Sequence, residues 1–375
     1  MSADTLLVGV AELTGRVTAI LRAFGCAPEV AAEVAGHLVR AEASGHVSHG
    51  ILRLPQYRQE IARGTIRPQA HPRVLKDAGA TILLDAQHCF GHYSTAVAAD
   101  LVGDRALAHG VAVVAVRGTT HIGRLGDYTE RLNGRGLVSI ISVGAAGPGI
   151  GAMAPFGTTA GPFLNSNPFA FGFPVDEGDG FVFDASMSNI AEGKVHAARD
   201  RGERLPEGAI LDAAARPTTD PADYYTGGTL TPLGGALAGH KGYGLALAAA
   251  LLGGLAHADG SRPDVTGIAS TAGATDGSPR IGGVALIAIN PAGFAQDLGY
   301  AHLVGGVLAS FHDAGAVIPG EFEAARRGAF TGVQLEQRAV NTLRELEADL
   351  LSEDLSSVRR RSRRGSALSW WRRDG

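Results

Sequence analysis

The sequence predicts an α/β protein with a mixed sheet and a helical subdomain at its N-terminal end. Two observations lead to this fold class. From about residue 76 onward, short apolar runs alternate with segments of helical spacing, as expected for a sheet that helices cover. Residues 1–75 show helical spacing instead. A chain of 375 residues, 45% of them hydrophobic, is long enough to bury two cores of this kind.

The first unit, residues 1–75, is expected to consist of helices. Apolar positions recur at helical spacing over residues 5–24, and the alanine-rich block 28–43 has the pattern of a second helix. A turn with two glycines follows. The third helix is predicted to begin near Leu54 and Pro55, because proline suits the first turn of a helix.

The second unit, residues 76–279, is expected to be mixed α/β. Residues 111–116 form an unbroken apolar run, the pattern of a strand buried on both faces. The other predicted strands lie within 74–86 and at 137–143, 169–174, 181–186 and 281–290, and the helices at 94–109, 126–132, 241–255 and 303–314. Residues 280–350 are expected to pack with the first unit, and residues 351–375 to form a disordered basic tail.

Composition and charge exclude several classes of protein. No apolar run reaches the ~18 residues that cross a membrane, and the N-terminus lacks the order of a signal peptide. With only Cys26 and Cys89, we expect a cytoplasmic setting. Residues 355–375 of this tail hold seven arginines and one acidic residue, whereas the rest of the chain is net negative. Because nucleic-acid affinity needs clustered positive charge, no nucleic-acid partner is expected, although the tail leaves this alternative open.

The most informative segment runs from Val111 to Leu132. It places His121 in the turn after a buried strand, where open α/β sheets collect their ligands. The ordinary pKa of histidine lies near neutrality, so this side chain can donate or accept a proton. The alternative is a histidine that only bonds to its own loop.

A second cluster, from Ser44 to Tyr57, contains two histidines and an arginine. If a helix begins here, His49 and Arg53 lie four residues apart on one face. A guanidinium group can hold a carboxylate with two parallel hydrogen bonds. The alternative is a solvated charged surface.

Two glycine-rich segments fail the usual nucleotide-binding patterns. Residues 144–157 do not give G-x-G-x-x-G, which argues against a standard dinucleotide fold. In residues 234–247, His240 precedes Lys241 and Gly242 replaces the magnesium-binding hydroxyl of a phosphate loop, so ATP hydrolysis is excluded. Glycine N–H groups at a helix start and the Lys241 charge still favour an anion. The alternative is a tight helix entry with a surface lysine.

Two further groups of polar residues are candidates for binding. Asp184 ends an apolar strand and precedes Ser186, a position that suits ribose hydroxyls, orientation of a histidine or simply a helix cap. His88 and His92 are four residues apart, a spacing that suits two metal ligands. No third strong ligand follows at a matching spacing, so no metal site is expected.

Taken together, these segments resemble the malate/L-lactate dehydrogenase family, which includes ureidoglycolate and sulfolactate dehydrogenases and piperideine-2-carboxylate reductase. The likeness runs from about residue 30 to 330, and the GRLG and PFG variants look most like the hydroxycarboxylate dehydrogenases. The motifs that carry it are Ser48-His49-Gly50-x-x-Arg53-x-Pro55-x-Tyr57, HIGRLGDY at His121, residues 165–169, Asp184-Ala-Ser-x-Ser188 with residues 192–194, 217–221 and 232–235, His240-Lys-Gly-Tyr-Gly244 and Pro319-Gly-Glu321.

The resemblance implies an NAD(P)-dependent oxidoreductase acting on a small 2-oxo or 2-hydroxy acid. It implies a non-Rossmann, sulfolactate dehydrogenase-like fold in which residues 76–279 bind the cofactor, and a homodimer. NAD is the favoured cofactor, and NADP is not excluded. The implied catalytic residues are His121 as acid/base with Ser48, His49 and Arg53, of which Arg53 is the better candidate for the substrate carboxylate. The implied cofactor contacts are Ser142, Asp184, Ala185, Ser186, His240, Lys241, Gly242, Pro319, Gly320 and Glu321.

The chain departs from many relatives at a few positions. Thr119 and Thr120 stand where many members have Ser-Asn, and Ser142-Val143 where many have Thr-Asn. Residues 236–239 are an addition that several relatives lack. Two alternatives to a hydroxy acid dehydrogenase stay open: a reductase of cyclic imino acids in the same family, and a non-catalytic member that only binds the cofactor.

Overall fold

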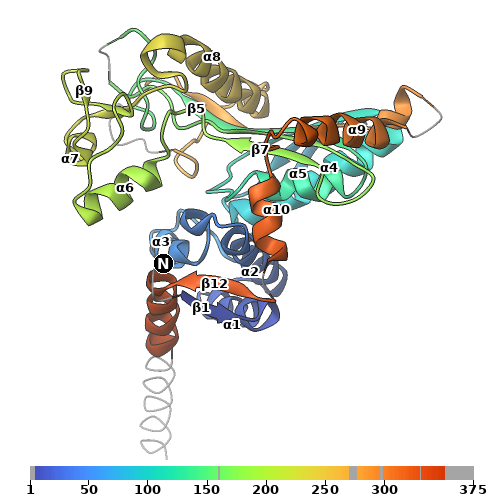
Figure 1. Cartoon of the computed structure of the whole chain (residues 1–375), viewed down its shortest axis with the longest axis horizontal. Coiled ribbons are helices and arrows are strands. Elements are labelled where there is room, and N and C mark those ends of the chain that lie inside the picture. Colours follow the sequence, from blue (N-terminus) through green and yellow to red (C-terminus); the bar gives the residue numbers. More distant parts are fainter. Residues whose placement is uncertain (1–4, 159–160, 270–276, 296–298, 330, 351–375) are drawn as a thin grey trace, which may run out of the picture.

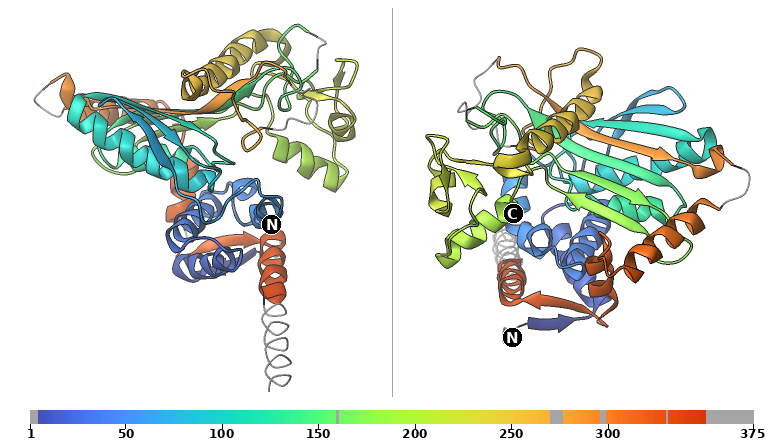
Figure 2. Two further views of the ribbon diagram at one scale, coloured as in Figure 1. Left: turned by 180° about the vertical axis from the view of Figure 1, so that it is seen from behind. Right: turned by 45° about the horizontal axis from the view of Figure 1, so that its top comes forward.

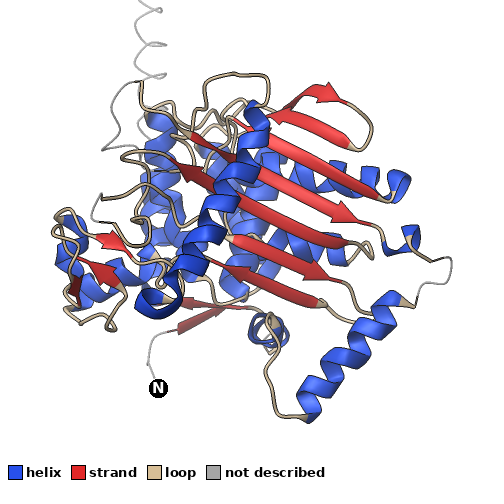
Figure 3. Ribbon diagram, turned by 90° about the horizontal axis from the view of Figure 1, so that it is seen from above, coloured by secondary structure: helices blue, strands red, loops and turns tan. Residues whose placement is uncertain are grey.

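The computed structural model describes residues 5–158, 161–269, 277–295, 299–329 and 331–350. Its centre is a seven-stranded mixed sheet in the order β2-β3-β4-β11-β5-β6-β7 (Figure 3), in which β3 and β4 form the parallel pair. The strands are β2 (Arg73–Asp77), β3 (Thr81–Asp85), β4 (Val111–Arg117), β5 (Val138–Ala146), β6 (Phe169–Phe173), β7 (Phe181–Ala185) and β11 (Ile281–Ile289). The predicted mixed sheet is thereby confirmed.

The apolar strands pair at the middle of this sheet. In β11, Val284 lies opposite Val116 of β4 on one side and Val143 of β5 on the other. All three side chains are buried, which accounts for the continuous apolar runs in the sequence.

Helices cover both faces of the sheet (Figures 1 and 2). On one face α4 (Gly91–His109) and α5 (Gly126–Asn133) bury the core that includes Val102 and Leu132. On the other face lies α8 (Gly235–Gly253). A Cβ on Gly144 of β5 would lie 2.7 Å from the Ala250 backbone nitrogen, so the missing side chain lets α8 approach the sheet.

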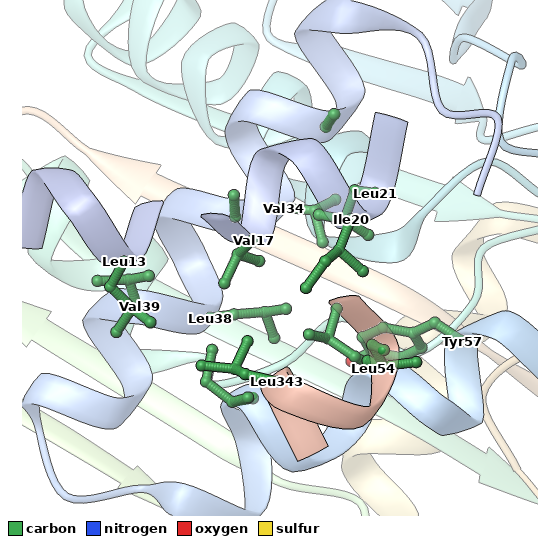
Figure 4. Close-up of a cluster of buried hydrophobic side chains, with 14 of the residues drawn as sticks. Leu13, Val17, Ile20, Leu21, Val34, Leu38, Val39, Leu54, Tyr57 and Leu343 are labelled. Carbon is green, nitrogen blue, oxygen red and sulfur yellow. The ribbon is translucent and has the colours of Figure 1, made fainter. Parts of the chain in front are cut away.

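The N-terminal helices form a separate layer below the sheet. It comprises α1 (Val10–Ala23), α2 (Pro28–Ala43), η1 (Val47–His49), η2 (Ile51–Arg53) and α3 (Leu54–Ala62). The chain returns here at its other end, because β12 (Val333–Glu336) pairs with β1 (Thr5–Val8) and residues 337–350 are helical. Figure 4 shows the shared core, in which Leu343 lies among residues of α1 and α2 such as Val17 and Leu38.

The other elements lie around the sheet and the helical layer (Figure 1). A small lobe contains α6 (Glu192–Arg201), β8 (Ile210–Leu211), β9 (Pro217–Thr218), α7 (Pro221–Tyr225) and β10 (Thr229–Leu230). The remaining elements are η3 (Gly254–His257), η4 (Pro291–Gly293), α9 (Tyr300–Asp313) and α10 (Glu321–Gly328). Within the described ranges, no helix is long and apolar enough to cross a membrane.

Three expectations from the sequence differ from the structure. Residues 5–8 form a strand because they pair with β12, a partner more than 300 residues away. The helix expected from Lys241 begins at Gly235. β11 belongs to the sheet, so the stretch 280–350 is shared between the sheet and the helical layer. The basic tail, 351–375, lies outside the described residues.

The close approach of α8 to the sheet predicts that Gly144→Ala destabilises the protein. The added methyl group would displace the helix backbone, so the free energy of unfolding should fall by about 1–3 kcal/mol. Urea unfolding of the full chain measures this. Gly15→Ala is the control, because nothing lies within 4 Å of that site in α1. It should raise stability by about 0.5–1 kcal/mol; equal stability of both variants would contradict the packing described.

Candidate active site

A cluster of aromatic and imidazole rings lies where the helical layer meets the loop between β4 and α5. The Tyr57 hydroxyl of α3 is 2.9 Å from His121 Nδ1, and the His49 ring stacks on the His121 ring at a centroid distance of 5.6 Å. His121 and His49 are 72 residues apart in sequence, yet the fold brings them into contact. The loop can follow this path because Gly123 has a positive φ of 74° and packs against His37, where a Cβ would be 2.2 Å from Nε2.

Arg53 belongs to the same cluster, although by a different geometry from the predicted one. Instead of a continuous helix, two 3₁₀ turns meet at Gly50. Arg53 Nε donates to the Ser48 carbonyl oxygen at 2.6 Å, and Ser48 Oγ lies 3.0 Å from His49 Nδ1. Ser48, His49 and Arg53 are therefore held together by two successive 3₁₀ turns. The expectation that His49 and Arg53 lie on one face of a helix is wrong.

A buried carboxyl group that the sequence analysis missed supports this turn. Glu42 Oε1 of α2 accepts a hydrogen bond from the Ile51 backbone N–H at 2.8 Å. Gly50 lies directly against the carboxyl group, since a Cβ there would be 2.3 Å from the same oxygen. Burial raises the pKa of Glu42 from 4.5 to about 7, with the Ile51 bond acting in the opposite direction.

Burial and charge keep both stacked histidines neutral. Burial lowers the pKa of His121 well below its ordinary value of 6.5, and the Arg53 guanidinium lowers it further. The same two causes bring the pKa of His49 to about 3. At neutral pH the site therefore presents two uncharged imidazoles beside one permanent cation.

Behind these residues lies a second layer of buried polar side chains. His92, at the start of α4, places Nε2 3.3 Å from the Tyr57 hydroxyl. The His37 ring lies edge-on to it at 4.7 Å, and His37 Nδ1 is 3.1 Å from Asp127 Oδ2. Burial opposes ionisation of Asp127, but His37 and two hydrogen bonds from Arg40 outweigh it and hold the pKa of that carboxyl far below its usual value.

The two histidines with metal-like spacing do not share a site. His92 faces Tyr57, whereas His88 Nε2 lies 3.6 Å from Asp264. Among the residues that the structure describes, no group of three or more His, Cys, Asp or Glu side chains is arranged to hold a metal ion.

Part of the candidate cofactor set comes together around β7. Asp184 Oδ2 accepts from the Gly126 backbone N–H at 2.8 Å. Burial raises the pKa of Asp184, and this hydrogen bond limits the rise. The Pro319–Gly320 turn packs against β7, because Gly320 contacts Val182 of that strand. Asp184, Pro319 and Gly320 line one cavity of about 260 Å³. The Glu321 carboxylate accepts from the Ile318 N–H and pairs with His312.

The other candidates lie on the α8 side. Ser142 is buried in β5, and its Oγ has no hydrogen-bond partner in the described part of the chain. Ser186 Oγ, next to Ala185, lies 2.5 Å from Ser188 Oγ. The segment after β7 reaches the start of α8, because the Leu233 N–H donates to the Met187 carbonyl at 2.9 Å.

The expected anion site at Lys241 is not at a helix start. Because α8 begins at Gly235, His240 and Lys241 are exposed within the helix, beyond its first turn, and Gly242 packs against Leu233. The free N–H groups of a helix N-terminus therefore lie before Lys241. The described contacts join neither His240 nor Lys241 to the His121 cluster; the His240 ring packs near Phe156 at 5.8 Å.

Comparison with known proteins supports the resemblance seen in the motifs. The sequence pattern of the family described as malate/L-lactate dehydrogenase matches residues 8–344. The chain belongs to this family. Hydroxycarboxylate dehydrogenase B of Escherichia coli (strain K12) is 36% identical over 240 residues, and the match spans 64% of this chain and 64% of that relative. The NADP⁺-dependent (2R)-3-sulfolactate dehydrogenase of Chromohalobacter salexigens is 34% identical, over 90% of this chain and 97% of the relative.

Solved structures of the malate/L-lactate dehydrogenase family share the fold. The Δ1-piperideine-2-carboxylate reductase of Pseudomonas syringae pv. tomato matches with a TM-score of 0.79 and 31% identity, over 91% of this chain and 100% of that one. Sulfolactate dehydrogenase of Methanocaldococcus jannaschii matches with a TM-score of 0.77 and 29% identity, over 92% and 97%. The predicted sulfolactate dehydrogenase-like fold is confirmed.

The position of Glu42 predicts a pH dependence of stability. A carboxyl group whose pKa is raised on folding binds more protons in the folded state, so stability is lost as pH rises from about 4.5 to about 7. Glu42→Gln keeps an acceptor for Ile51 and cannot ionise. We expect urea unfolding to show the variant gaining about 1–3 kcal/mol relative to the wild type across this window. A difference between the two proteins that does not change with pH would contradict the assignment.

Proposed function

We propose that this protein is an NAD(P)-dependent oxidoreductase that transfers a hydride between a nicotinamide and C2 of a small 2-oxo or 2-hydroxy acid. The supporting observation is the stacked His121–His49 pair beside Arg53, in a chain whose relatives are named as dehydrogenases of hydroxy acids and reductases of cyclic imino acids. An acid–base group next to a fixed cation suits a substrate that carries a carboxylate beside a carbonyl.

In this proposal Arg53 binds the substrate carboxylate. Its Nε bond to Ser48 and its NH1 bond to Gln56 hold the guanidinium in place before the substrate arrives. A carboxylate at Arg53 offsets the positive charge that lowers the pKa of His121, so binding raises that pKa and favours proton uptake. His121 then gives the proton to the oxygen on C2 during reduction, and takes it back from the hydroxyl during oxidation.

The cofactor is proposed to lie along β5, β7 and the Pro319–Glu321 turn. The Ser142 hydroxyl, which has no partner among the described residues, and the cavity beside Asp184, Pro319 and Gly320 suit a group with ribose hydroxyls and amides. When bound, the nicotinamide supplies or accepts the hydride at C4. The residues proposed to hold it are Ser142, Asp184, Ala185, Ser186, His240, Lys241, Gly242, Pro319, Gly320 and Glu321. NAD is the proposed form, and NADP is the alternative that one relative uses.

The second candidate function is reduction of a cyclic imino acid. It is favoured by the likeness to the Pseudomonas syringae reductase, which the chain matches over almost its whole length. Arg53 would bind the carboxylate of the cyclic imino acid in the same way, and the bond reduced would be C=N instead of C=O. The two functions are separated by assaying NADH and NADPH oxidation at 340 nm with 2-oxo acids and with cyclic imines. Absence of turnover with bound cofactor would favour a non-catalytic member.

The proposed roles predict distinct kinetic losses at the site. His121→Gln should lower kcat by about 10²–10⁴, because general acid–base catalysis is lost, while cofactor affinity is kept. Arg53→Gln should weaken substrate binding by about 2–5 kcal/mol, and Arg53→Lys should recover part of it. Steady-state kinetics and cofactor titration measure both effects. His49→Gln is the comparison that decides the acid–base role: if it abolishes turnover and His121→Gln does not, the two roles are exchanged.

We also propose that the chain works as a homodimer that uses α9. This helix has no buried residue in the single chain, and Leu303, Val307 and Phe311 form an apolar stripe on it. Leu303 also lines an apolar cavity of about 600 Å³.

The dimer predicts a specific effect of charge on this stripe. The double variant Leu303→Arg, Phe311→Arg should elute as a monomer in size-exclusion chromatography with light scattering. In a dimer, its two new arginines would be buried against the same arginines of the second subunit, without a negative partner. Val74→Glu, an exposed apolar position on β2, is the control and should leave the mass unchanged. A double variant that retains the mass of a dimer would exclude α9 as the interface.

A further inference from the structure

The Tyr57 hydroxyl lies between the imidazoles of His121, which is half-buried, and His92, which is buried. It is 2.9 Å from His121 Nδ1 and 3.3 Å from His92 Nε2. The Tyr57 and His92 side chains are fully buried, so no bulk water replaces either contact. Burial raises the pKa of Tyr57, which keeps its hydroxyl protonated. A phenol has a single proton, so it can donate to only one of the two histidines and must accept from the other or from neither.

The proposed acid–base role of His121 requires one of these two arrangements. His121 Nδ1 bonds to Tyr57, and Nε2 has no hydrogen-bond partner in the described ranges, so Nε2 is the nitrogen that exchanges a proton with the substrate. To act as a base, neutral His121 must keep its proton on Nδ1 and leave the Nε2 lone pair open. Nδ1–H then donates to the Tyr57 oxygen. The Tyr57 proton consequently needs another acceptor, and His92 Nε2 is the one within reach.

His92 has the properties that this acceptor needs. Burial lowers its pKa well below the ordinary value, and nearby His37 adds to the effect, so the ring is neutral and has a lone pair to offer. Its Nδ1 has no partner among the described residues, so no bond at that nitrogen dictates where the ring proton lies. His37 is different: its Nδ1 pairs with Asp127, and its Nε2 accepts from the Arg124 N–H at 3.0 Å.

We propose that His92 is a positioning residue for His121: by accepting the Tyr57 proton, it makes the Tyr57 oxygen an acceptor for His121 Nδ1–H and so leaves His121 Nε2 free to take a proton. Without this acceptor, the Tyr57 proton turns to His121 Nδ1 and locks neutral His121 in its Nε2–H tautomer, which cannot act as a base. The inference rests on the proposed function only for its catalytic consequence; the coupling of the two rings stands on the geometry.

The charged and titratable groups around these rings come from every neighbouring element. They are Arg53 and His49 from the 3₁₀ turns, His37 from α2 and Asp127 from α5. None of them contacts the Tyr57 hydroxyl in the described structure, so a change at residue 92 alters the hydroxyl direction without removing a charge.

The test is the tautomer of His121 in the full-length protein, read from histidine ¹⁵N chemical shifts at pH 8, with the His121 signals assigned by their loss in His121→Gln. We expect Nδ1–H in the wild type and Nε2–H in His92→Phe. His92→Gln should restore Nδ1–H, because the amide oxygen can accept the Tyr57 proton. If phenylalanine prevents folding, His92→Met removes the acceptor with a more flexible side chain.

Kinetics give the second readout and separate this inference from the proposed function. In His92→Phe, oxidation of the 2-hydroxy acid should slow by about 10-fold or more, with a shifted pH profile, unchanged KM and recovery in His92→Gln. Nε2–H in the wild type, an unchanged His121 tautomer in His92→Phe, or no restoration in His92→Gln would overturn the role of His92, whatever the activity. Wild-type protein without turnover that still shows the tautomer switch would overturn the proposed function and leave the coupling intact.

Discussion

The hydrogen bond between Tyr57 and His121 joins the two halves of the molecule at the point where chemistry is proposed. Tyr57 belongs to the helical layer, and His121 to the loop that leaves the central sheet. The bond can form because the loop lies close to the helices, which glycines at residues 91 and 123 permit: a Cβ at Gly91 would lie 2.3 Å from the Thr120 carbonyl oxygen. The return of the chain through β12 to pair with β1 completes the layer that carries Tyr57. Packing of two distant chain segments thus sets the position of one imidazole.

The electrostatics of the site follow from the same packing. Burial makes charging of His121 and His49 costly, and Arg53 adds to the cost, so the free site has one cation and two neutral rings. Further back, Asp127 remains ionised because Arg40 and His37 bind it, and Glu42 supports the Ile51 N–H from below. These buried polar groups differ in how many hydrogen-bond or charged partners they have. Asp127 has several polar partners, whereas the second oxygen of Glu42 and Nδ1 of His92 have none in the described part of the molecule. Of these two groups, Glu42 is the one whose protonation responds to pH near neutrality, because burial raises its pKa to about 7.

The sequence predicted the features that depend on local pattern. The apolar run before His121 placed that residue at a strand end, and Asp184 at the end of β7 was identified in the same way. The start of α8 was misplaced because Gly234 takes a positive φ that lets the helix begin at Gly235 despite its glycines. The pairing of β1 with β12 and the bonds from His37 and Glu42 could not be read from the sequence, because their partners are set by tertiary packing. Buried ionisable side chains within the apolar face of α2 were the one available signal for His37 and Glu42.

Proton uptake on binding of a substrate analogue tests the central claim most directly. Oxamate, an unreactive isostere of a 2-oxo acid, would be mixed with the cofactor-bound protein at pH 7 in weak buffer with a pH indicator. The account predicts proton uptake on binding, because a carboxylate at Arg53 offsets the positive charge that helps to lower the pKa of His121. The uptake should disappear in His121→Gln and persist in His49→Gln. Binding without proton uptake, or uptake that survives His121→Gln, would contradict the assignment of His121 as the acid–base residue.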